Sequence, residues 1–251
     1  RQLFAHHGDY VAGVRLPDGI GAGTSAHARH AYWQPRAGEQ LRLRLAGPTS
    51  RHAPVLLLPE LPGSAASAAP LADALAADRA TLTPDPPGCG ESTPAAEATP
   101  ERFAADLLHL LEELDWPRVD VVATFTAAPV ALELARAGGG RVGGLVFEGI
   151  LLTGAAERQE LAADYGIPLT PQRDGGHLLA AWTMLRDREL NWPWYARSTA
   201  SIRRRTPDLD PGRLHAQTLD LLRQPEDYAA LATACLARDV AAALPALEQA
   251  A

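Results

Sequence analysis

The stretch Val119-Asp-Val-Val-Ala-Thr-Phe-Thr-Ala-Ala-Pro-Val-Ala-Leu-Glu-Leu-Ala135 decides the fold, because two periodicities meet in it without a linker. Residues 119–123 are rich in valine, which predicts a strand. Residues 130–137 place apolar side chains at helical spacing, which predicts a helix. A strand that passes directly into a helix is the building block of a parallel α/β sheet.

The same alternation extends along the chain on both sides of this stretch. Leu41-Arg-Leu-Arg-Leu45 alternates strictly and predicts an antiparallel strand with one wet face, whereas Val55-Leu-Leu-Leu58 predicts a strand buried on both faces. We therefore expect an α/β protein with a right-handed, doubly wound, mostly parallel sheet. Strands are predicted at 28–33, 41–45, 55–58, 80–83, 119–123 and 145–147, and helices at 68–77, 101–114 and 130–137.

The character of the sequence changes after about residue 152. Residues 155–235 carry helical patterns and no strand-like run, and they include an aromatic-rich segment from Trp182 to Tyr195. We divide the chain into a core at 1–152, a helical cap at 153–235 and a helix at 236–251 that returns to the core.

The composition excludes several classes of function. The net charge of −7 argues against nucleic acid as a partner, and the longest uncharged apolar stretch, 121–132, is too short and too polar to span a membrane. All 23 basic residues are arginine, so a Schiff-base lysine is impossible, and the two cysteines exclude a four-thiolate zinc site. We expect a cytoplasmic protein without a metal or other cofactor. Four histidines without carboxylate or thiol neighbours are not assigned as metal ligands: His6, His7, His27 and His30.

Three motifs, in order, make the chain resemble the α/β-hydrolase family. They are Val55-Leu-Leu-Leu-Pro-Glu-Leu-Pro-Gly-Ser64, Pro84-Asp-Pro-Pro-Gly-Cys-Gly-Glu-Ser92 and the stretch 119–135. In that family they correspond to a strand with its oxyanion loop, a Pro-Gly loop, and the strand, elbow and helix that carry the nucleophile. The motifs are most similar to those of haloalkane dehalogenase- and epoxide hydrolase-like proteins, whose cap is inserted where residues 155–235 lie here. The resemblance implies a fold, and each functional position must be interpreted separately.

The resemblance implies an elbow of the form Gly-x-nucleophile-x-Gly, which here reads Ala123-Thr-Phe-Thr-Ala127. Phe125 stands at the nucleophile position and has no heteroatom, so it cannot attack a carbonyl. The flanking alanines are small enough for the tight turn. Thr124 and Thr126 carry hydroxyls but have no base beside them, so we interpret them, together with Phe125, as contacts to a bound molecule.

The resemblance also implies an oxyanion hole made by two backbone amides, those of Leu61 and Thr126. Pro59 and Glu60 stand where the family has His-Gly, so Glu60 places a carboxylate beside this hole. A carboxylate repels an anion unless it is protonated or turned away. Backbone amides do not depend on these side chains, so an anion-binding site without a nucleophile remains open.

The rest of the family's catalytic triad is degenerate. Glu148 follows the strand after the elbow, a position that the resemblance assigns to the triad acid, and the alternative is a carboxylate that faces water. The triad histidine should follow the last strand, but the last histidine is His215, inside the expected cap. The sequence stops where the family's final two strands would begin, so we expect these strands to be missing from this chain. A homodimer or a second chain that completes the sheet remains open.

Several further residues are candidates for the site. His177 begins a helical run and is either an acid or base that reaches the pocket or a residue that hydrogen-bonds locally. Cys89 is a small loop residue rather than a nucleophile, and Asp85 is expected to brace its own loop. The aromatic residues of the cap either pack between cap and sheet or form the wall of an apolar pocket: Trp182, Trp192, Trp194 and Tyr195.

Three functions from different classes remain open. The first, which we favour, is a non-hydrolytic enzyme that performs an elimination, isomerisation or cyclisation on a small, largely apolar molecule, with Glu60, Glu148 or His177 as acid or base. The second is a non-catalytic protein that binds a small molecule or a partner protein. The third is a hydrolase whose nucleophile is displaced.

Overall fold

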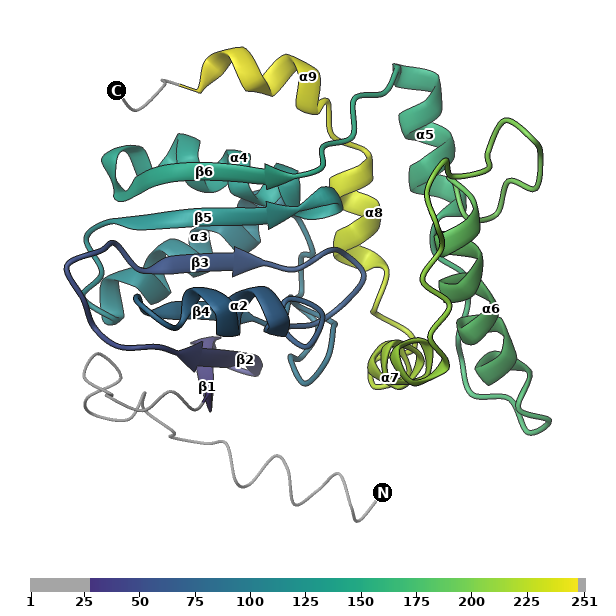
Figure 1. Cartoon of the computed structure of the whole chain (residues 1–251), viewed down its shortest axis with the longest axis horizontal. Helices are drawn as coiled ribbons and strands as arrows, with labels where there is room; N and C mark the ends of the chain where they lie inside the picture. The colour runs from purple at the N-terminus through teal and green to yellow at the C-terminus, as the bar shows by residue number, and fades with distance from the viewer. Residues whose placement is uncertain (1–27, 248–251) are drawn as a thin grey trace.

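The computed structural model describes residues 28–247, and its centre is a six-stranded sheet in the order β1-β2-β4-β3-β5-β6 (Figure 1). The pairs β1–β2 and β2–β4 are antiparallel, whereas β3 pairs with β4 and β5, and β5 with β6, in parallel. The predicted α/β fold with a mostly parallel sheet is therefore confirmed. The strands are β1 (Arg29–Arg36), β2 (Glu39–Ala46), β3 (Val55–Leu58), β4 (Thr81–Pro84), β5 (Val119–Thr124) and β6 (Val142–Glu148).

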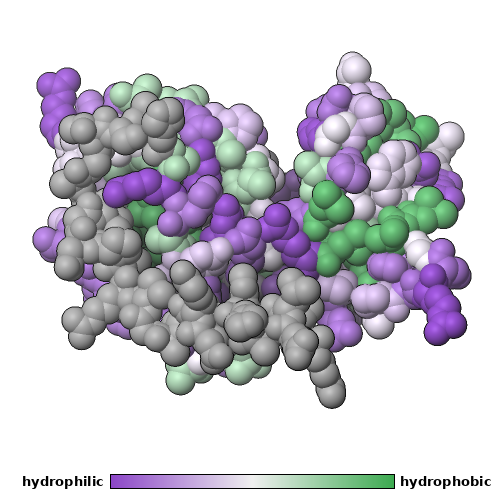
Figure 2. All heavy atoms as spheres, turned by 90° about the horizontal axis from the view of Figure 1, so that it is seen from below, coloured by the Kyte–Doolittle hydropathy of each residue, from purple (hydrophilic) through white to green (hydrophobic). Residues whose placement is uncertain are grey.

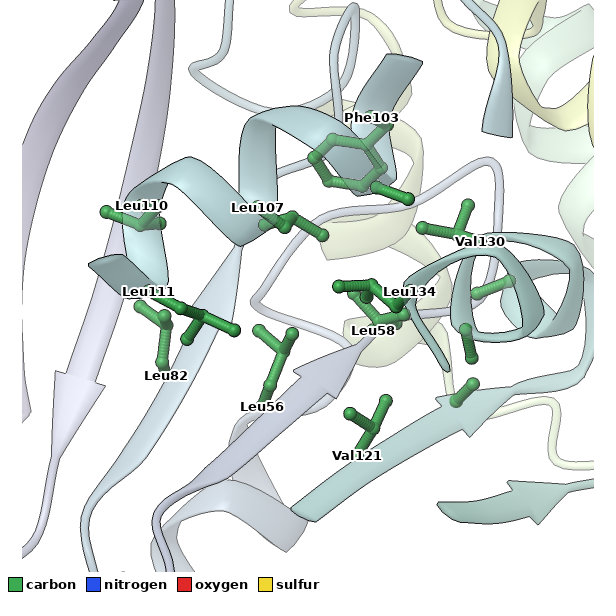
Figure 3. Packing of buried hydrophobic residues seen from close by; sticks show 14 of the residues in the cluster. Leu56, Leu58, Leu82, Phe103, Leu107, Leu110, Leu111, Val121, Val130 and Leu134 are labelled. Carbon is green, nitrogen blue, oxygen red and sulfur yellow. The ribbon is translucent and has the colours of Figure 1, made fainter. Parts of the chain in front are cut away.

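Helices cover both faces of this sheet. Leu56 and Leu58 of β3 belong to the large apolar cluster that includes residues of α3 and α4 (Figure 3). Val55 and Leu57 pack in a second cluster with Ala72 of α2. This alternation is the expected result of a strand buried on both faces. Full burial of a leucine side chain stabilises the fold by about 1.5–3 kcal/mol, so the strand ends are firmly positioned. The helices are α2 (Ala69–Leu75), α3 (Pro100–Glu113) and α4 (Ala128–Gly138).

The cap is a helical layer with an apolar cluster of its own. Leu161, Tyr165, Met184 and Leu214 are all buried in this cluster. In Figure 1 the cap helices lie beyond the carboxyl ends of the parallel strands, facing the edge where sites of such folds occur. They are α5 (Ala155–Asp164), α6 (Gly176–Leu190) and α7 (Pro211–Leu221).

Helix α8 (Ala230–Leu236) stands between the sheet and the cap, at the ends of the strands (Figure 1). Its residues Leu231, Ala232 and Cys235 belong to the core cluster, whereas Leu236 belongs to the cap cluster. The predicted division at residues 153–235 and 236–251 stays a prediction, but the packing joins α8 to the core. A short helix, α9 (Val240–Ala243), follows.

Strand β6 forms one edge of the described sheet. Its Val146 is 56% exposed, in contrast to Val119 and Val121 of β5, which are fully buried. This is the edge at which the family's final strands are expected, and among the described residues no strand pairs with it on its outer side. The sheet thus ends where the sequence predicts it to end.

The surface divides into two lobes, the core and the cap (Figure 2). On the face that Figure 2 shows, the strongly apolar atoms gather on the cap lobe. Five large apolar residues of the cap are exposed: Leu178, Leu179, Ile202, Leu209 and Leu219. Within residues 28–247, no helix combines the length and the apolarity that crossing a membrane requires.

Candidate functional site

The elbow keeps the backbone geometry that the resemblance implies. Phe125 follows β5, has a φ of 45° and begins a 3₁₀ turn that leads into α4. This left-handed conformation costs a residue with a Cβ about 1–2 kcal/mol. The tight turn predicted at residues 123–127 is therefore present, with an aromatic ring where the family places its nucleophile.

The ring of Phe125 fills the space above the elbow. It meets the ring of Trp192 edge-to-face, with 4.9 Å between the centroids and an interplanar angle of 81°. The cavity that remains beside Phe125 and Thr126 measures about 10 Å³. A single water molecule needs roughly 10–15 Å³, so no substrate fits there.

The expected anion-binding site is also occupied by the protein itself. The Leu61 backbone N–H donates to Thr126 Oγ1 at 2.7 Å, and the Thr126 hydroxyl donates to the Leu61 carbonyl at 2.8 Å. Both residues are buried. The Leu61 N–H consequently has no hydrogen bond to offer to an anion, because it already donates to the hydroxyl of Thr126. This hydrogen bond does not support the expected role of the amide as an oxyanion donor, which stays a prediction.

The three candidate acids and bases do not converge on one point. Glu148 Oε2 accepts from the exposed Thr124 hydroxyl at 3.1 Å, at the outer end of β6. His177 Nδ1 accepts from the backbone N–H of Gln172 at 3.0 Å, which is the local helix-start role left open above. Glu60 pairs with Arg188, 2.8 Å from Oε1 to Nη2. Of the three, only Glu60 lines a cavity described below.

The aromatic residues of the cap pack with one another and with the core. Trp192 contacts Phe125 and Tyr165, and Trp194 donates its Nε1–H to the Tyr165 carbonyl at 2.9 Å. Trp182, Trp192, Trp194 and Tyr195 all belong to, or pack against, the cap cluster. They line neither the 10 Å³ cavity nor the larger one described below, so their interpretation as a pocket wall is not supported.

The Pro-Gly loop has a structural role. Asp85 is fully buried and accepts from the backbone N–H groups of Ala65 and Glu91, at 2.8 and 2.9 Å. It braces its own loop, as predicted. Burial raises the pKa of the Cys89 thiol to about 12, so this cysteine is not a thiolate near neutral pH and is not a nucleophile.

A second cavity, of about 230 Å³, lies between the core and the cap. The loop after β3 forms one wall, and α6 and α7 form the other. On α7 the polar residues Arg213, Gln217 and Asp220 recur at helical spacing and face the cavity together. The remaining lining residues are Glu60, Pro62, Gly63, Ala66, Ser67, Pro70, Leu185, Arg188, Ala216 and Leu221.

Of the charged residues that line this cavity, the sequence alone predicted only Glu60 as a site residue. Arg188 lies three residues after the buried Leu185, and Asp220 three after Gln217, so both patterns were visible. Charged residues at such spacing are usually solvated helix positions, and nothing in the sequence shows that these helix faces are turned towards the loop at 60–70. Only the packing of the cap on the core distinguishes them.

The described residues contain no group of three or more histidine, cysteine or acidic side chains placed to hold a metal ion. His30 instead shares a 2.9 Å contact between its Nδ1 and Arg42 Nη2. The other histidines named above, His6, His7 and His27, lie outside the described residues.

Comparison with known proteins identifies the fold. Residues 53–173 match the family model described as alpha/beta hydrolase fold. The chain therefore has the α/β-hydrolase fold, and the resemblance to that superfamily is confirmed. No curated protein matches the sequence.

Solved structures similar to this chain include enzymes of that fold. A thermophilic esterase from Thermogutta terrifontis with malate bound is 21% identical, with a TM-score of 0.64 over 88% of this chain and 77% of that chain. Epoxide hydrolase A from Mycobacterium thermoresistibile is 19% identical, with a TM-score of 0.62 over 86% and 77%. A hydrolase from Pseudomonas aeruginosa PA01 is 20% identical, with a TM-score of 0.63 over 88% and 77%. The uncovered part of these chains is consistent with a sheet that lacks its final strands here.

Proposed function

We propose that this protein is a non-catalytic, small-molecule-binding protein built on the α/β-hydrolase fold. The observation that carries the proposal is the contact between Phe125 and Trp192, which fills the position where a hydrolase would hold the reacting carbonyl. The hydrogen bonds between Thr126 and Leu61 support it, because they use the amide that would stabilise an oxyanion. A cavity of about 230 Å³ beside the loop at 60–70 has room for a small ligand.

The test measures turnover and binding on the same sample. The wild-type protein is assayed with p-nitrophenyl acetate and with styrene oxide, and we expect rates no higher than those of buffer with heat-denatured protein. Thermal unfolding is then followed with a panel of small amines, alcohols, carboxylates and amides, and we expect stabilisation by at least one of these classes. Saturable turnover of the ester or the epoxide, abolished by Thr126→Val or by thiol alkylation, would overturn the proposal. A lack of stabilisation by any of the four ligand classes would also overturn it.

A non-hydrolytic enzyme is the second candidate, because Glu60 lines this cavity and pairs with Arg188 at 2.8 Å. A carboxylate in that position suits a general base. This function predicts that a ligand of the cavity is converted to product and that Glu60→Gln abolishes the conversion. Non-catalytic binding predicts an unchanged ligand, recovered intact after prolonged incubation and identified by mass spectrometry.

The cellular location and the oligomeric state of the protein remain predictions. The composition is the basis for expecting a cytoplasmic protein. The exposure of Val146 at the edge strand β6 is the basis for expecting a homodimer or a second chain there. Size-exclusion chromatography with light scattering tests the second of these directly.

A further inference from the structure

The larger cavity is separate from the elbow although one loop borders both. Leu61 turns towards the elbow and bonds with Thr126, while its neighbours Glu60 and Pro62 line the cavity. Neither Phe125 nor Thr126 is among the lining residues. A ligand in the cavity is therefore recognised by a set of side chains that the hydrolase site does not use.

Arg188 supplies hydrogen-bond donors to this cavity. Its side chain is 13% exposed, and within residues 28–247 the acidic group at ion-pair distance from it is Glu60, which one Nη2 nitrogen meets at 2.8 Å. Burial lowers the pKa of the guanidinium, but the attraction of Glu60 outweighs this effect and the pKa is raised. A guanidinium has further N–H groups on its other nitrogens. Since Glu60 balances its charge, these donors suit a neutral oxygen acceptor rather than a second anion.

Asp220, in contrast to Arg188, supplies a negatively charged hydrogen-bond acceptor to this cavity. Within the described chain no arginine or histidine lies at ion-pair distance from its carboxylate; the nearby Arg223 pairs instead with Glu91 at 2.5 Å. Burial raises the pKa of Asp220, against the lowering effect of a hydrogen bond with Ser64. Arg213, on the same helix face, is engaged by Glu189 and Asp208 at 3.2 and 2.7 Å. Asp220 is thus a partly buried carboxylate of the cavity lining that Ser64 hydrogen-bonds and Arg223 attracts, but that forms no ion pair within the described residues.

We propose that the cavity binds a small protonated amine whose other end carries a hydroxyl or carbonyl oxygen, with Asp220 receiving the ammonium group and Arg188 donating to the oxygen. This rests on the small-molecule-binding function proposed above. The apolar residues of the lining, among them Pro62, Leu185 and Leu221, suit a short aliphatic spacer. The volume of about 230 Å³ is below the roughly 300–1,000 Å³ of pockets for drug-sized ligands, so the amine must be small.

The experiment uses four probes of equal chain length in isothermal titration calorimetry of the wild-type protein near pH 7. They are 4-aminobutan-1-ol, butylammonium, butan-1-ol and butanoate. We expect 4-aminobutan-1-ol to bind most tightly, butylammonium at least threefold more weakly, and the alcohol and the carboxylate not measurably. If butanoate or butan-1-ol binds as well as the amines, or if none of the four binds at millimolar concentration, the proposed ligand class is wrong.

Two variants assign the ends of the ligand. Asp220→Asn is expected to weaken the binding of both amines at least tenfold. Arg188→Gln is expected to remove the advantage of 4-aminobutan-1-ol over butylammonium. Because this change leaves the Glu60 carboxylate unpaired, Glu60→Gln is added in the same background, and this double variant should bind butylammonium as the wild type does. The matched controls are Asp164→Asn and Arg173→Gln, which change exposed residues outside the cavity and should bind as the wild type does. Amine binding that Asp220→Asn leaves intact would overturn the assignment.

A third variant covers the case in which Arg188→Gln does not fold. Ala216 is an exposed residue of the lining, so Ala216→Phe fills the cavity without removing a charge or a core side chain. It should abolish the binding of both amines while its thermal unfolding without ligand stays close to that of the wild type. The outcomes also separate this proposal from the broader one. Binding of carboxylates or alcohols alone refutes the amine, whereas ester or epoxide turnover refutes the non-catalytic function.

Discussion

The elbow and the core–cap cavity lie on two sides of one loop, yet they have opposite character. At the elbow Phe125 packs on Trp192, and the Thr126 hydroxyl bonds both main-chain groups of Leu61. In the cavity, Asp220 and Arg188 are the groups that we propose bind a ligand. Under the proposed function, the fold keeps the backbone of a hydrolase elbow, while the binding site lies beside it.

The elbow also keeps a strained backbone at a residue whose side chain carries no nucleophile. Phe125 keeps the positive φ that exposes a nucleophile in an enzyme, although it exposes a ring here. Such strain persists only when the surrounding packing over-determines it. Here α8, Trp192 and the following helix α4 provide that packing, so the turn is now a structural contact between core and cap.

The largest expected effect comes from removing the ring that closes the elbow. Trp192→Ala deletes the contacts with Phe125 and Tyr165, and we expect a loss of about 3–5 kcal/mol in the free energy of unfolding. Phe125→Ala and the double variant complete a thermodynamic cycle, measured by urea denaturation. The coupling between the two rings should be about 0.5–1.5 kcal/mol. A coupling near zero would show that the rings do not close the elbow together.

A smaller effect is expected from the hydroxyl that occupies the Leu61 amide. Thr126→Val keeps the shape but leaves a buried N–H and a buried carbonyl without a partner, which should cost about 1–3 kcal/mol. Thr124→Val is the matched control, because its hydroxyl bonds Glu148 at an exposed position, and it should change stability by less than about 0.5 kcal/mol. Equal effects from the two substitutions would contradict the buried role of Thr126.

Relief of the backbone strain at Phe125 should change the free energy of unfolding by about 1 kcal/mol. Glycine usually destabilises relative to alanine, but at a φ of 45° glycine avoids the penalty of a Cβ. Phe125→Gly should therefore be more stable than Phe125→Ala by about 1 kcal/mol in chemical denaturation. The reverse order would show that the turn relaxes when the ring is absent.

The smallest effect concerns Asp220 and depends on pH. Its folded pKa is raised above the ordinary 3.8, so the folded state prefers the neutral acid, and its contribution to stability is lost as the pH rises through the folded pKa. Asp220→Asn should consequently be slightly more stable than the wild type at pH 7, with the difference shrinking as the pH falls towards 3.8. Thermal unfolding of the wild type and of Asp220→Asn across this pH range measures the stability difference. A stability difference that widens at low pH would contradict the burial of a carboxylate without an ion-pair partner.

The fold could be read from the sequence to within a few residues, because its signals are local. The continuous apolar run at 55–58 and the passage from strand to helix at 119–137 specify buried strands and the elbow without knowledge of the rest. The site could be read only in part. Whether Thr126 bonds Leu61, and whether Arg188 and Asp220 face one cavity, depends on how distant segments pack, and side chains at helical spacing look the same on a solvated face.

Hydrogen–deuterium exchange of the wild-type protein with and without saturating 4-aminobutan-1-ol tests most directly whether the ligand site lies beside the elbow rather than at it. We predict that the bound ligand slows backbone amide exchange in the loop at residues 60–70 and in α7, and leaves exchange at residues 124–131 unchanged. Protection confined to residues 124–131 would contradict it.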